Sequence, residues 1–235
     1  MPKQVENAAS DDYLSAIYRL THDEGLEAFA VRLSDRLSVT PPSVAGMLKR
    51  LQRDNLVQLD KRKTIKLTTR GQKRAEQMVR RHRLAECLLT TILKIPWWQA
   101  YEEAHLLEHG ISDVTEPNLF QALGKPTRSP FGYPIPGTRD ANEPLSMATL
   151  SETTEGTAVQ IDRVFEEDEQ LLQFFDAEGL RPGVILKVSL VEQYRGTLTV
   201  EIENRSIVLG SQVAGRIWTC RPKSQAELRA SIGIT

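Results

Sequence analysis

Three of the four histidines in the sequence stand close to carboxylates at helical spacing. His105, Glu108 and His109 occupy positions i, i+3 and i+4, so in a helix they project from one face within one turn. Two imidazoles and a carboxylate at this spacing can bind one divalent metal ion. His82 and Glu86 form a second pair with i, i+4 spacing. Five such residues on two neighbouring helices favour a metal site over solvated surface pairs.

The same residues fit a second pattern, H-x-x-E-H, which is typical of one class of zinc metalloproteases. In those enzymes the two histidines bind zinc and the glutamate, here Glu108, is the general base. Such an enzyme also needs a third protein ligand, an open metal position and a substrate cleft. Because the motif follows a strongly basic segment in a chain short for that class, we predict a metal-binding protein that is not an enzyme and keep the protease as an alternative.

Helical periodicity predicts the elements that must position these side chains. Helices are expected at 11–22, with Ser10 or Asp11 as the N-terminal cap, and at 31–37, 40–54, 69–93, 97–109 and 113–123. Pro96 separates the helix at 69–93 from the helix at 97–109. If these two helices pack antiparallel, the two histidine-containing pairs come close together.

The segment from Val31 to Arg83 is strongly basic. It contains 15 Lys/Arg and 4 Asp/Glu, a net charge of +11, whereas the rest of the chain has a net charge of −12. Within it, two β-prone runs at 56–59 and 64–68 flank a basic tip and follow the helices at 31–37 and 40–54. This order predicts a winged helix-turn-helix that binds double-stranded DNA. The alternative is a winged helix that contacts a protein.

The predicted recognition helix begins with short side chains that can reach base edges: Thr40, Pro42 and Ser43. Basic side chains further along the helix and at the hairpin tip are predicted to contact phosphates or the minor groove: Lys49, Arg50, Arg53, Lys61, Arg62 and Lys63. Such contacts supply affinity and salt dependence rather than sequence specificity.

The C-terminal third has a different pattern. Five of the 12 prolines fall between Pro126 and Pro144, which predicts an extended linker with turns. Short strands are then expected at 158–161, 184–191, 198–202, 206–209 and 216–219, with a helix at 168–177. This pattern predicts a small β-barrel of about 70 residues.

Composition limits the remaining classes. With 235 residues, of which 40% are hydrophobic and 26% charged, the chain is expected to form a soluble protein. It has no apolar run long enough to span a membrane and no apolar signal-peptide region near its start. The two cysteines, Cys87 and Cys220, are far apart in sequence, which fits the cytoplasm rather than a disulfide framework.

Several motifs resemble the diphtheria toxin repressor family of metalloregulators, over about residues 11–220. They are Asp-Tyr-Leu-x-x-Ile-Tyr at 12–18, Arg-His-Arg-Leu-Ala-Glu at 81–86, Glu-Ala-His-Leu-Leu-Glu-His at 103–109, and Arg-Ser-Pro-Phe-Gly-Tyr-Pro-Ile-Pro-Gly at 128–137. Ala-Glu-Gly-Leu-Arg-Pro-Gly at 177–183 resembles the SH3-like, FeoA-type domain of longer members.

The resemblance implies a mainly α protein with a small β domain. The expected domains are a winged helix-turn-helix (1–74), a helical metal-binding and dimerisation domain (75–140), a linker (141–152), an SH3-like domain (153–222) and a frayed or weakly helical tail (223–235).

The resemblance also implies the metal ligands. Asp12, His105, Glu108 and His109 correspond to the family's primary site. Iron-type members have methionine and cysteine at the positions of Asp12 and His105, and manganese-type members have aspartate and glutamate. Carboxylate and imidazole donors suit Mn²⁺ or Fe²⁺. The resemblance to manganese-type members at Asp12 and Tyr101 implies Mn²⁺ first and Fe²⁺ second, while Zn²⁺ or Co²⁺ would substitute in vitro.

A second site in the family corresponds to His82, Glu86 and Glu166, although Arg163 and Tyr101 stand where other members have ligands. In shorter manganese-type members the position of His82 joins a site next to the primary one.

The implied function is repression of metal-uptake genes when metal is plentiful, by a homodimer on an inverted-repeat operator. Metal would fix the winged helix relative to the dimerisation helices and so shift a population of conformations. Four apolar residues are expected either near the dimer interface or in the core: Trp97, Trp98, Leu106 and Leu107. A metal-independent winged-helix protein is the other alternative.

Overall fold

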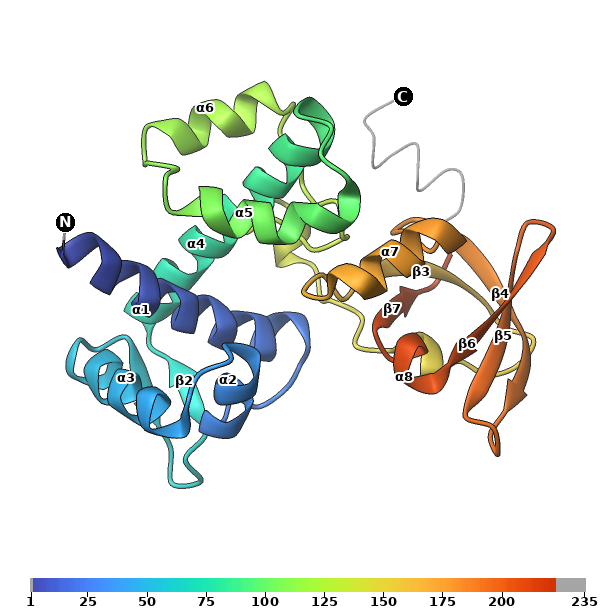
Figure 1. The fold of residues 1–235 in the computed structure, drawn as a ribbon, viewed down its shortest axis with the longest axis horizontal. Helices are drawn as coiled ribbons and strands as arrows, with labels where there is room; N and C mark the ends of the chain where they lie inside the picture. The colour runs from blue at the N-terminus through green and yellow to red at the C-terminus, as the bar shows by residue number, and fades with distance from the viewer. Residues whose placement is uncertain (1, 223–235) are drawn as a thin grey trace. The chain divides into compact units, whose positions relative to one another are not determined.

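The computed structural model describes residues 2–222, which form two compact units (Figure 1). The first unit runs to Leu88 and includes Ala104–Thr127 and Pro134–Glu143. The second comprises Leu89–Glu103, Arg128–Tyr133 and the chain from Pro144 onward. The tail expected at 223–235 lies outside the described residues. None of the described helices is long and apolar enough to cross a bilayer.

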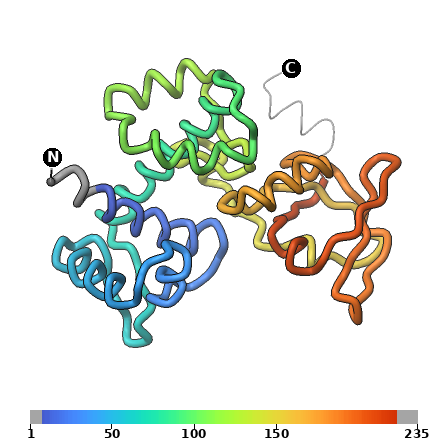
Figure 2. Tube along the Cα trace, in the orientation of Figure 1, coloured from blue at the N-terminus to red at the C-terminus, as the bar shows by residue number. Residues whose placement is uncertain are grey.

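The first unit opens with the elements of a winged helix. In chain order they are α1 (Pro2–Tyr18), the π-helical turn η1 (Arg19–Asp23), α2 (Ala30–Arg36), α3 (Pro41–Arg53), β1 (Val57–Leu59) and β2 (Ile65–Leu67). The strands pair antiparallel, and Ala28 adds an isolated bridge to Ile65. The tip of this hairpin projects beyond the helices (Figure 2). The predicted order of elements is confirmed.

The predicted start of the first helix is wrong. Ser10 and Asp11 lie inside α1 and are buried, so neither caps it. Asp11 accepts a hydrogen bond from Arg74 of α4 at 2.5 Å, and the Ser10 hydroxyl contacts the sulfur of Met47 in α3 at 3.8 Å. Both polar side chains therefore stabilise packing between helices instead of a helix end.

An apolar core joins α1 to the rest of the winged helix. Leu14 and Ile17 of α1 are fully buried together with Leu33, Leu51 and Ile65. Leu14 and Ile17 are three residues apart in α1, and this helical spacing places both on the face that packs against the core.

Three further helices follow: α4 (Thr69–Cys87), α5 (Ala100–Glu108) and α6 (Thr115–Ala122). The helix expected at 69–93 is α-helical only to Cys87 and continues as the π-helical turn η2 (Leu88–Ile92), and α5 is preceded by the 3-10 turn η3 (Trp97–Gln99). α1 and α6 both contact α4. The Arg80 guanidinium of α4 lies 4.5 Å from the centroid of the Phe120 ring in α6.

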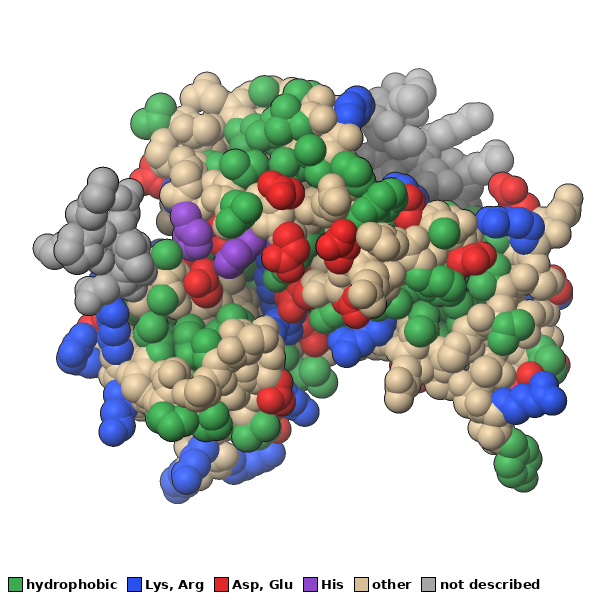
Figure 3. Space-filling model, in the orientation of Figure 1, with side chains coloured by type: hydrophobic (Ala, Val, Ile, Leu, Met, Phe, Trp, Pro, Cys, Tyr) green, Lys and Arg blue, Asp and Glu red, His purple; other side chains and the backbone are tan. Residues whose placement is uncertain are grey.

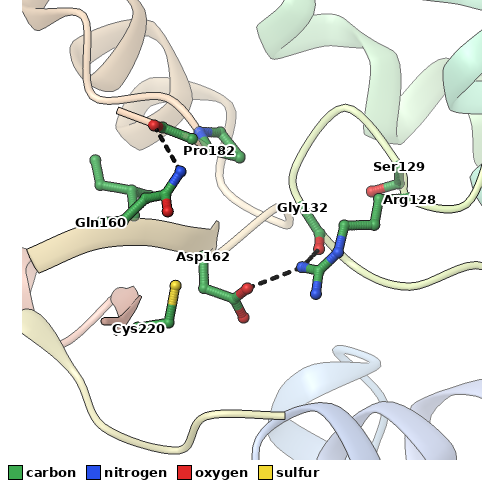
Figure 4. Close-up of a pocket in the computed structure, with 9 residues that line it drawn as sticks. Arg128, Ser129, Gly132, Gln160, Asp162, Pro182 and Cys220 are labelled. Atoms are coloured by element: carbon green, nitrogen blue, oxygen red, sulfur yellow. Dashed lines mark hydrogen bonds and ion pairs between the residues drawn. The ribbon is translucent and has the colours of Figure 1, made fainter. Parts of the chain in front are cut away.

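The segment predicted as an extended linker is largely buried, so that prediction is wrong. Phe131 is fully buried in the second unit, where its ring centroid lies 5.1 Å from that of Trp97. Arg128 donates hydrogen bonds to Asp162 of β3 at 2.9 Å and to the Gly132 carbonyl at 2.7 Å (Figure 4). Aromatic side chains between the prolines supply apolar area that an exposed linker would leave in water.

Gly132 fits this contact for a steric reason. Its φ is +94°, and a Cβ there would lie 2.2 Å from the Asp162 carbonyl oxygen. Only glycine allows the segment to approach the strand so closely.

The rest of the second unit is a small antiparallel sheet with an SH3-like arrangement. Its strands are β3 (Ala158–Val164), β4 (Ile185–Glu192), β5 (Thr197–Ile202), β6 (Arg205–Gly210) and β7 (Ile217–Cys220), in the order β6-β5-β4-β3-β7. Register shifts interrupt the β3–β7 and β4–β5 ladders. The helix α7 (Glu169–Glu178) is capped by Asp168, whose side chain accepts from the Leu171 amide. The short turns η4 (Asp140–Asn142), η5 (Leu150–Glu152) and α8 (Ser211–Ala214) have no counterpart among the predicted elements.

Candidate metal centre and nucleic-acid interface

The structure brings together the four residues predicted for the primary site. Asp12 comes from α1, and His105, Glu108 and His109 come from α5 and the residue that follows it. The Asp12 Oδ1 lies 3.3 Å from His109 Nε2. The Glu108 Oε1 lies 3.2 Å from His105 Nδ1 and 3.5 Å from His109 Nε2. These contacts join α1 of the winged helix to α5.

His82 of α4 belongs to the same cluster. Its Nδ1 lies 2.7 Å from Glu108 Oε2, and its Nε2 lies 3.0 Å from Glu86 Oε1. Two groups of potential donors result, Asp12–Glu108–His109 and His82–His105–Glu108, and the ligand atoms within each group lie within 4.8 Å of one another. Glu108 is common to both groups, so its carboxylate can bridge them. Histidine side chains are visible at the surface beside acidic ones in this region (Figure 3).

Burial and charge set the protonation of this cluster. Burial and the charge of Arg19 lower the pKa of His82, but the carboxylates of Glu86 and Glu108 outweigh them and raise that pKa to about 9. Burial raises the pKa of Glu108, yet hydrogen bonds from His105 and His82 and nearby positive charges bring it down to about 2. At neutral pH the metal-free cluster therefore contains a protonated His82 between two carboxylates.

The pKa values of Asp12 and His105, two outer members of the cluster, are both raised. Burial raises the pKa of Asp12 against the opposing charges of His105 and His109. The hydrogen bond to Glu108 raises the pKa of His105. Since His105 and His109 are partly exposed, the cluster has a buried floor and an open side.

The donor set fits a divalent ion. It combines three carboxylates with three imidazoles and includes no thiolate, and oxygen and nitrogen donors of this kind suit Mn²⁺, Fe²⁺ and Zn²⁺. Glu86 and His82 are almost completely buried, at 0% and 1% exposure. Buried ionisable groups in such number are expected where they are paired or bind metal.

The remaining members of the predicted second site lie in the second unit. Glu166 is buried there, and its role as a ligand stays a prediction. Arg163 is fully buried, with its guanidinium 4.8 Å from the Trp218 ring centroid and 2.8 Å from an oxygen of Asp162. A guanidinium offers no lone pair to a metal ion, so this position contributes no ligand.

Sequence reasoning missed a buried charged residue that acts on the cluster through its charge. Arg19 lies directly after α1, seven residues after Asp12, and is only 5% exposed. Its charge acts on His82 and on Glu108. The available signal was an arginine directly after the apolar residues Ile17 and Tyr18 that end α1.

Arg83, like Arg19, is a buried arginine of the first unit, and it links three parts of that unit. Arg83 of α4 donates to Asp23 at 2.5 Å and to the Pro134 carbonyl at 2.7 Å. The charge of Arg83 outweighs the effect of burial and lowers the pKa of Asp23. This pair fixes the end of η1 against α4 next to the metal cluster.

The predicted DNA-contacting residues lie at the start of α3, along it, and at the hairpin tip. Thr40 caps α3 by accepting from the Ser43 amide at 3.4 Å. Thr40, Pro42, Ser43, Lys49, Arg53, Lys61, Arg62 and Lys63 are exposed, and Arg50 is half-buried. Arg62 also contacts Glu27 at 3.1 Å, and Arg50 lies 3.9 Å from Asp54. Lys and Arg side chains are prominent over the winged helix in Figure 3.

The four apolar residues considered for a dimer interface separate into two groups. Trp97 is buried in the second unit, where its indole N–H donates to the Pro130 carbonyl at 3.2 Å, and Trp98 is half-buried. Leu106 and Leu107 of α5 are 73% and 39% exposed. Trp97 is thus a core residue, while the two leucines form an exposed apolar pair.

Comparison with known proteins places this architecture in a family. Residues 7–65 match the model of the iron dependent repressor N-terminal DNA binding domain. Residues 68–137 match the iron dependent repressor metal binding and dimerisation domain, and residues 148–219 match the FeoA domain.

Individual relatives agree with the family models. The diphtheria toxin repressor of Corynebacterium diphtheriae is 33% identical over 216 residues, which cover 87% of this chain and 93% of the relative. The iron-dependent repressor IdeR of Mycobacterium leprae is 39% identical over 128 residues, which cover 54% of this chain and 55% of the relative. A solved manganese-dependent transcriptional repressor in complex with manganese superposes with a TM-score of 0.83 at 29% identity, covering 90% of this chain and 99% of the other.

The winged helix, the metal-binding helices and the SH3-like sheet define a metal-dependent, DNA-binding transcriptional repressor. The chain belongs to the diphtheria toxin repressor family of iron-dependent repressors. Its relatives are repressors, which favours a regulator over the protease alternative. The geometry also favours a regulator. The Glu108 carboxylate of the H-x-x-E-H motif is 5% exposed and contacts three histidines.

Proposed function

We propose that this protein represses metal-uptake genes in response to Mn²⁺, with Fe²⁺ as the next candidate signal. The observation that carries the proposal is the cluster in which Asp12 of the winged helix meets Glu108 and His109 of the metal-binding region. Its oxygen and nitrogen donors favour Mn²⁺ or Fe²⁺ over soft ions. The similar solved repressor is described as a complex with manganese, which supports the first choice.

Binding strength by itself does not identify the signal. Zn²⁺ and Co²⁺ bind nitrogen and oxygen sites at least as tightly as Mn²⁺ under the usual affinity order, so both are expected to substitute in vitro. The physiological ion is the one that acts at the free concentration found in cells.

The proposed mechanism uses the cluster to fix α1 against α5. When bound, a divalent ion supplies positive charge that the facing carboxylates and imidazoles share. Asp12 then holds α1, while Glu108 and His109 hold α5, so the winged helix loses freedom relative to the dimerisation helices. This shifts the population toward the conformation that fits DNA, by no more than the difference in metal affinity between the two states.

We further propose that a homodimer reads an inverted repeat. Thr40, Pro42 and Ser43 at the start of α3 would contact base edges, and the basic residues further along would contact phosphates. The exposed Leu106 and Leu107 provide an apolar surface on α5 for the second copy. Two-fold symmetry of the protein then requires two-fold symmetry of the operator.

The test is DNA binding by purified protein. A duplex with a randomised central region is selected with protein and Mn²⁺, and binding of the selected duplex is then measured by fluorescence anisotropy with chelator or with graded Mn²⁺, anaerobic Fe²⁺ or Zn²⁺. We expect binding only with metal, and loss of that response in Asp12→Ala while the fold is retained. Equal binding with chelator would instead support a metal-independent winged-helix protein.

A further inference from the structure

Two ion pairs between protein side chains hold α1 and the turn that follows it against α4. Asp11 lies 2.5 Å from the Arg74 guanidinium, and Asp23, at the end of η1, lies 2.5 Å from that of Arg83. Positions 74 and 83 belong to one continuous helix, so the two arginines are separated by about 13 Å along its axis. Two attachment points this far apart oppose both sliding and tilting of α1 on α4.

The stretch between these ion pairs is apolar and contains the candidate ligand of α1. Four residues of α1 and α4 between the pairs are fully buried in one hydrophobic cluster: Leu14, Ile17, Ala75 and Val79. Asp12 directly follows Asp11, and His82 directly precedes Arg83. Contacts within the protein therefore set the helix of Asp12 relative to the helix of His82.

α5 has no comparable attachment to these two helices. α1 packs against α2, η1, β2 and α4, and α4 packs against α6, but among the described residues α5 has no extensive interface with either helix. Within the first unit, the buried side chains of α5 are those of Ala104 and Glu108, whereas Leu106 and Leu107 are exposed. A single methyl group buries little apolar area, so the attachment of α5 depends on the charged contacts of Glu108 and His109.

We propose that the pairs Asp11–Arg74 and Asp23–Arg83 position Asp12 on α4 before metal binds, and that the element which gains order on metal binding is therefore α5. Arg74 and Arg83 act as positioning residues, because a guanidinium offers no lone pair to a metal ion and both act through the helix that carries Asp12. The inference rests on the proposed metal-sensing function and concerns the regulation of that same site. Only the donors of α5 then remain to be ordered on binding, which lowers the entropy cost of the response.

The first experiment is hydrogen–deuterium exchange of the full chain, followed by mass spectrometry, with chelator and with saturating Mn²⁺. Amides at 13–23 should be protected already in chelator and change less than about twofold with Mn²⁺, whereas protection at 104–109 should increase about tenfold or more. A gain at 13–23 as large as that at 104–109 would overturn the inference alone. A wild type that binds neither Mn²⁺, Fe²⁺ nor Zn²⁺ would overturn the proposed function, and this inference with it.

The second experiment separates positioning from simple charge effects. Arg74→Met removes the ion pair at a partly exposed position, and Arg74→Lys keeps the charge. Lys73→Met is the matched control, because it removes the same charge from the neighbouring, exposed position on α4. Loss of a positive charge favours cation binding nearby, so electrostatics alone predicts tighter Mn²⁺ binding by both methionine variants.

Positioning predicts the opposite sign for Arg74→Met. Calorimetry should show Mn²⁺ binding weakened at least about threefold in Arg74→Met, unchanged or tighter in Lys73→Met, and close to wild type in Arg74→Lys. Exchange at 13–23 in chelator should also be faster in Arg74→Met than in the wild type. An Arg74→Met variant that is folded by circular dichroism and binds Mn²⁺ as tightly as the wild type would overturn the inference. The exchange experiment on the wild type decides it even if this variant does not fold.

Discussion

The protonated His82 makes the metal-free protein sensitive to alkaline pH. Its pKa in the folded state is about 9, above its ordinary value of 6.5, because Glu86 and Glu108 hold the imidazolium between them. This contribution to stability is fully present below pH 6.5 and is lost as the pH rises through 9. A shift of this size corresponds to about 3 kcal/mol of unfolding free energy.

The assay is urea unfolding of the metal-free protein, with chelator present, at several pH values between 6.5 and 9.5. We expect the unfolding free energy to decrease by about 3 kcal/mol across this range. His105, whose pKa is also raised, contributes with the same sign. In His82→Gln the decrease should be much smaller, since the buried titrating group is gone. A wild type whose stability is flat over this range, or a His82→Gln variant with an undiminished decrease, would refute the reasoning.

Metal binding should release the proton that His82 carries in the metal-free protein. If His82 becomes a ligand, its proton must leave at neutral pH, so Mn²⁺ affinity should rise up to about tenfold per pH unit below pH 9. Calorimetry in two buffers of different ionisation enthalpy measures the released proton directly. A metal that binds without proton release at pH 7 would show that His82 stays outside the coordination sphere.

Two further predictions concern packing and assembly. Gly71→Ala should destabilise the protein by about 1–3 kcal/mol, because the added Cβ would lie 1.9 Å from the Leu56 carbonyl oxygen. Gly46→Ala should stabilise the protein by about 1 kcal/mol, because a Cβ at this position in α3 meets only open space. Urea unfolding of both variants checks this, and equal effects would contradict it. Leu106→Glu, at a 73% exposed position, should weaken the proposed dimer at least tenfold without changing the unfolding of the protomer. Sedimentation equilibrium measures the dissociation, and an unchanged dimer would place the interface elsewhere.

Periodicity in the sequence was enough to predict most helices and strands and several local pairings. The spacing of His105, Glu108 and His109 is a property of one helix, so the period of 3.6 residues was enough to predict a shared face. The order of elements in the winged helix likewise follows from local patterns, and the structure agrees with it. Charge composition was sufficient to identify the basic segment.

Contacts between helices, and the burial that results, depend on packing between segments that are distant in the sequence. His82 and Glu108 are 26 residues apart, and their 2.7 Å contact depends on how α4 and α5 pack. Burial of Arg19 and of Phe131 depends on surfaces supplied by distant segments. Local spacing fixes the direction of a side chain relative to its own helix, but the partner across the interface follows from packing of the whole unit. For that reason the sequence predicted candidate metal ligands on each helix, and the structure brings these side chains together in one charged cluster.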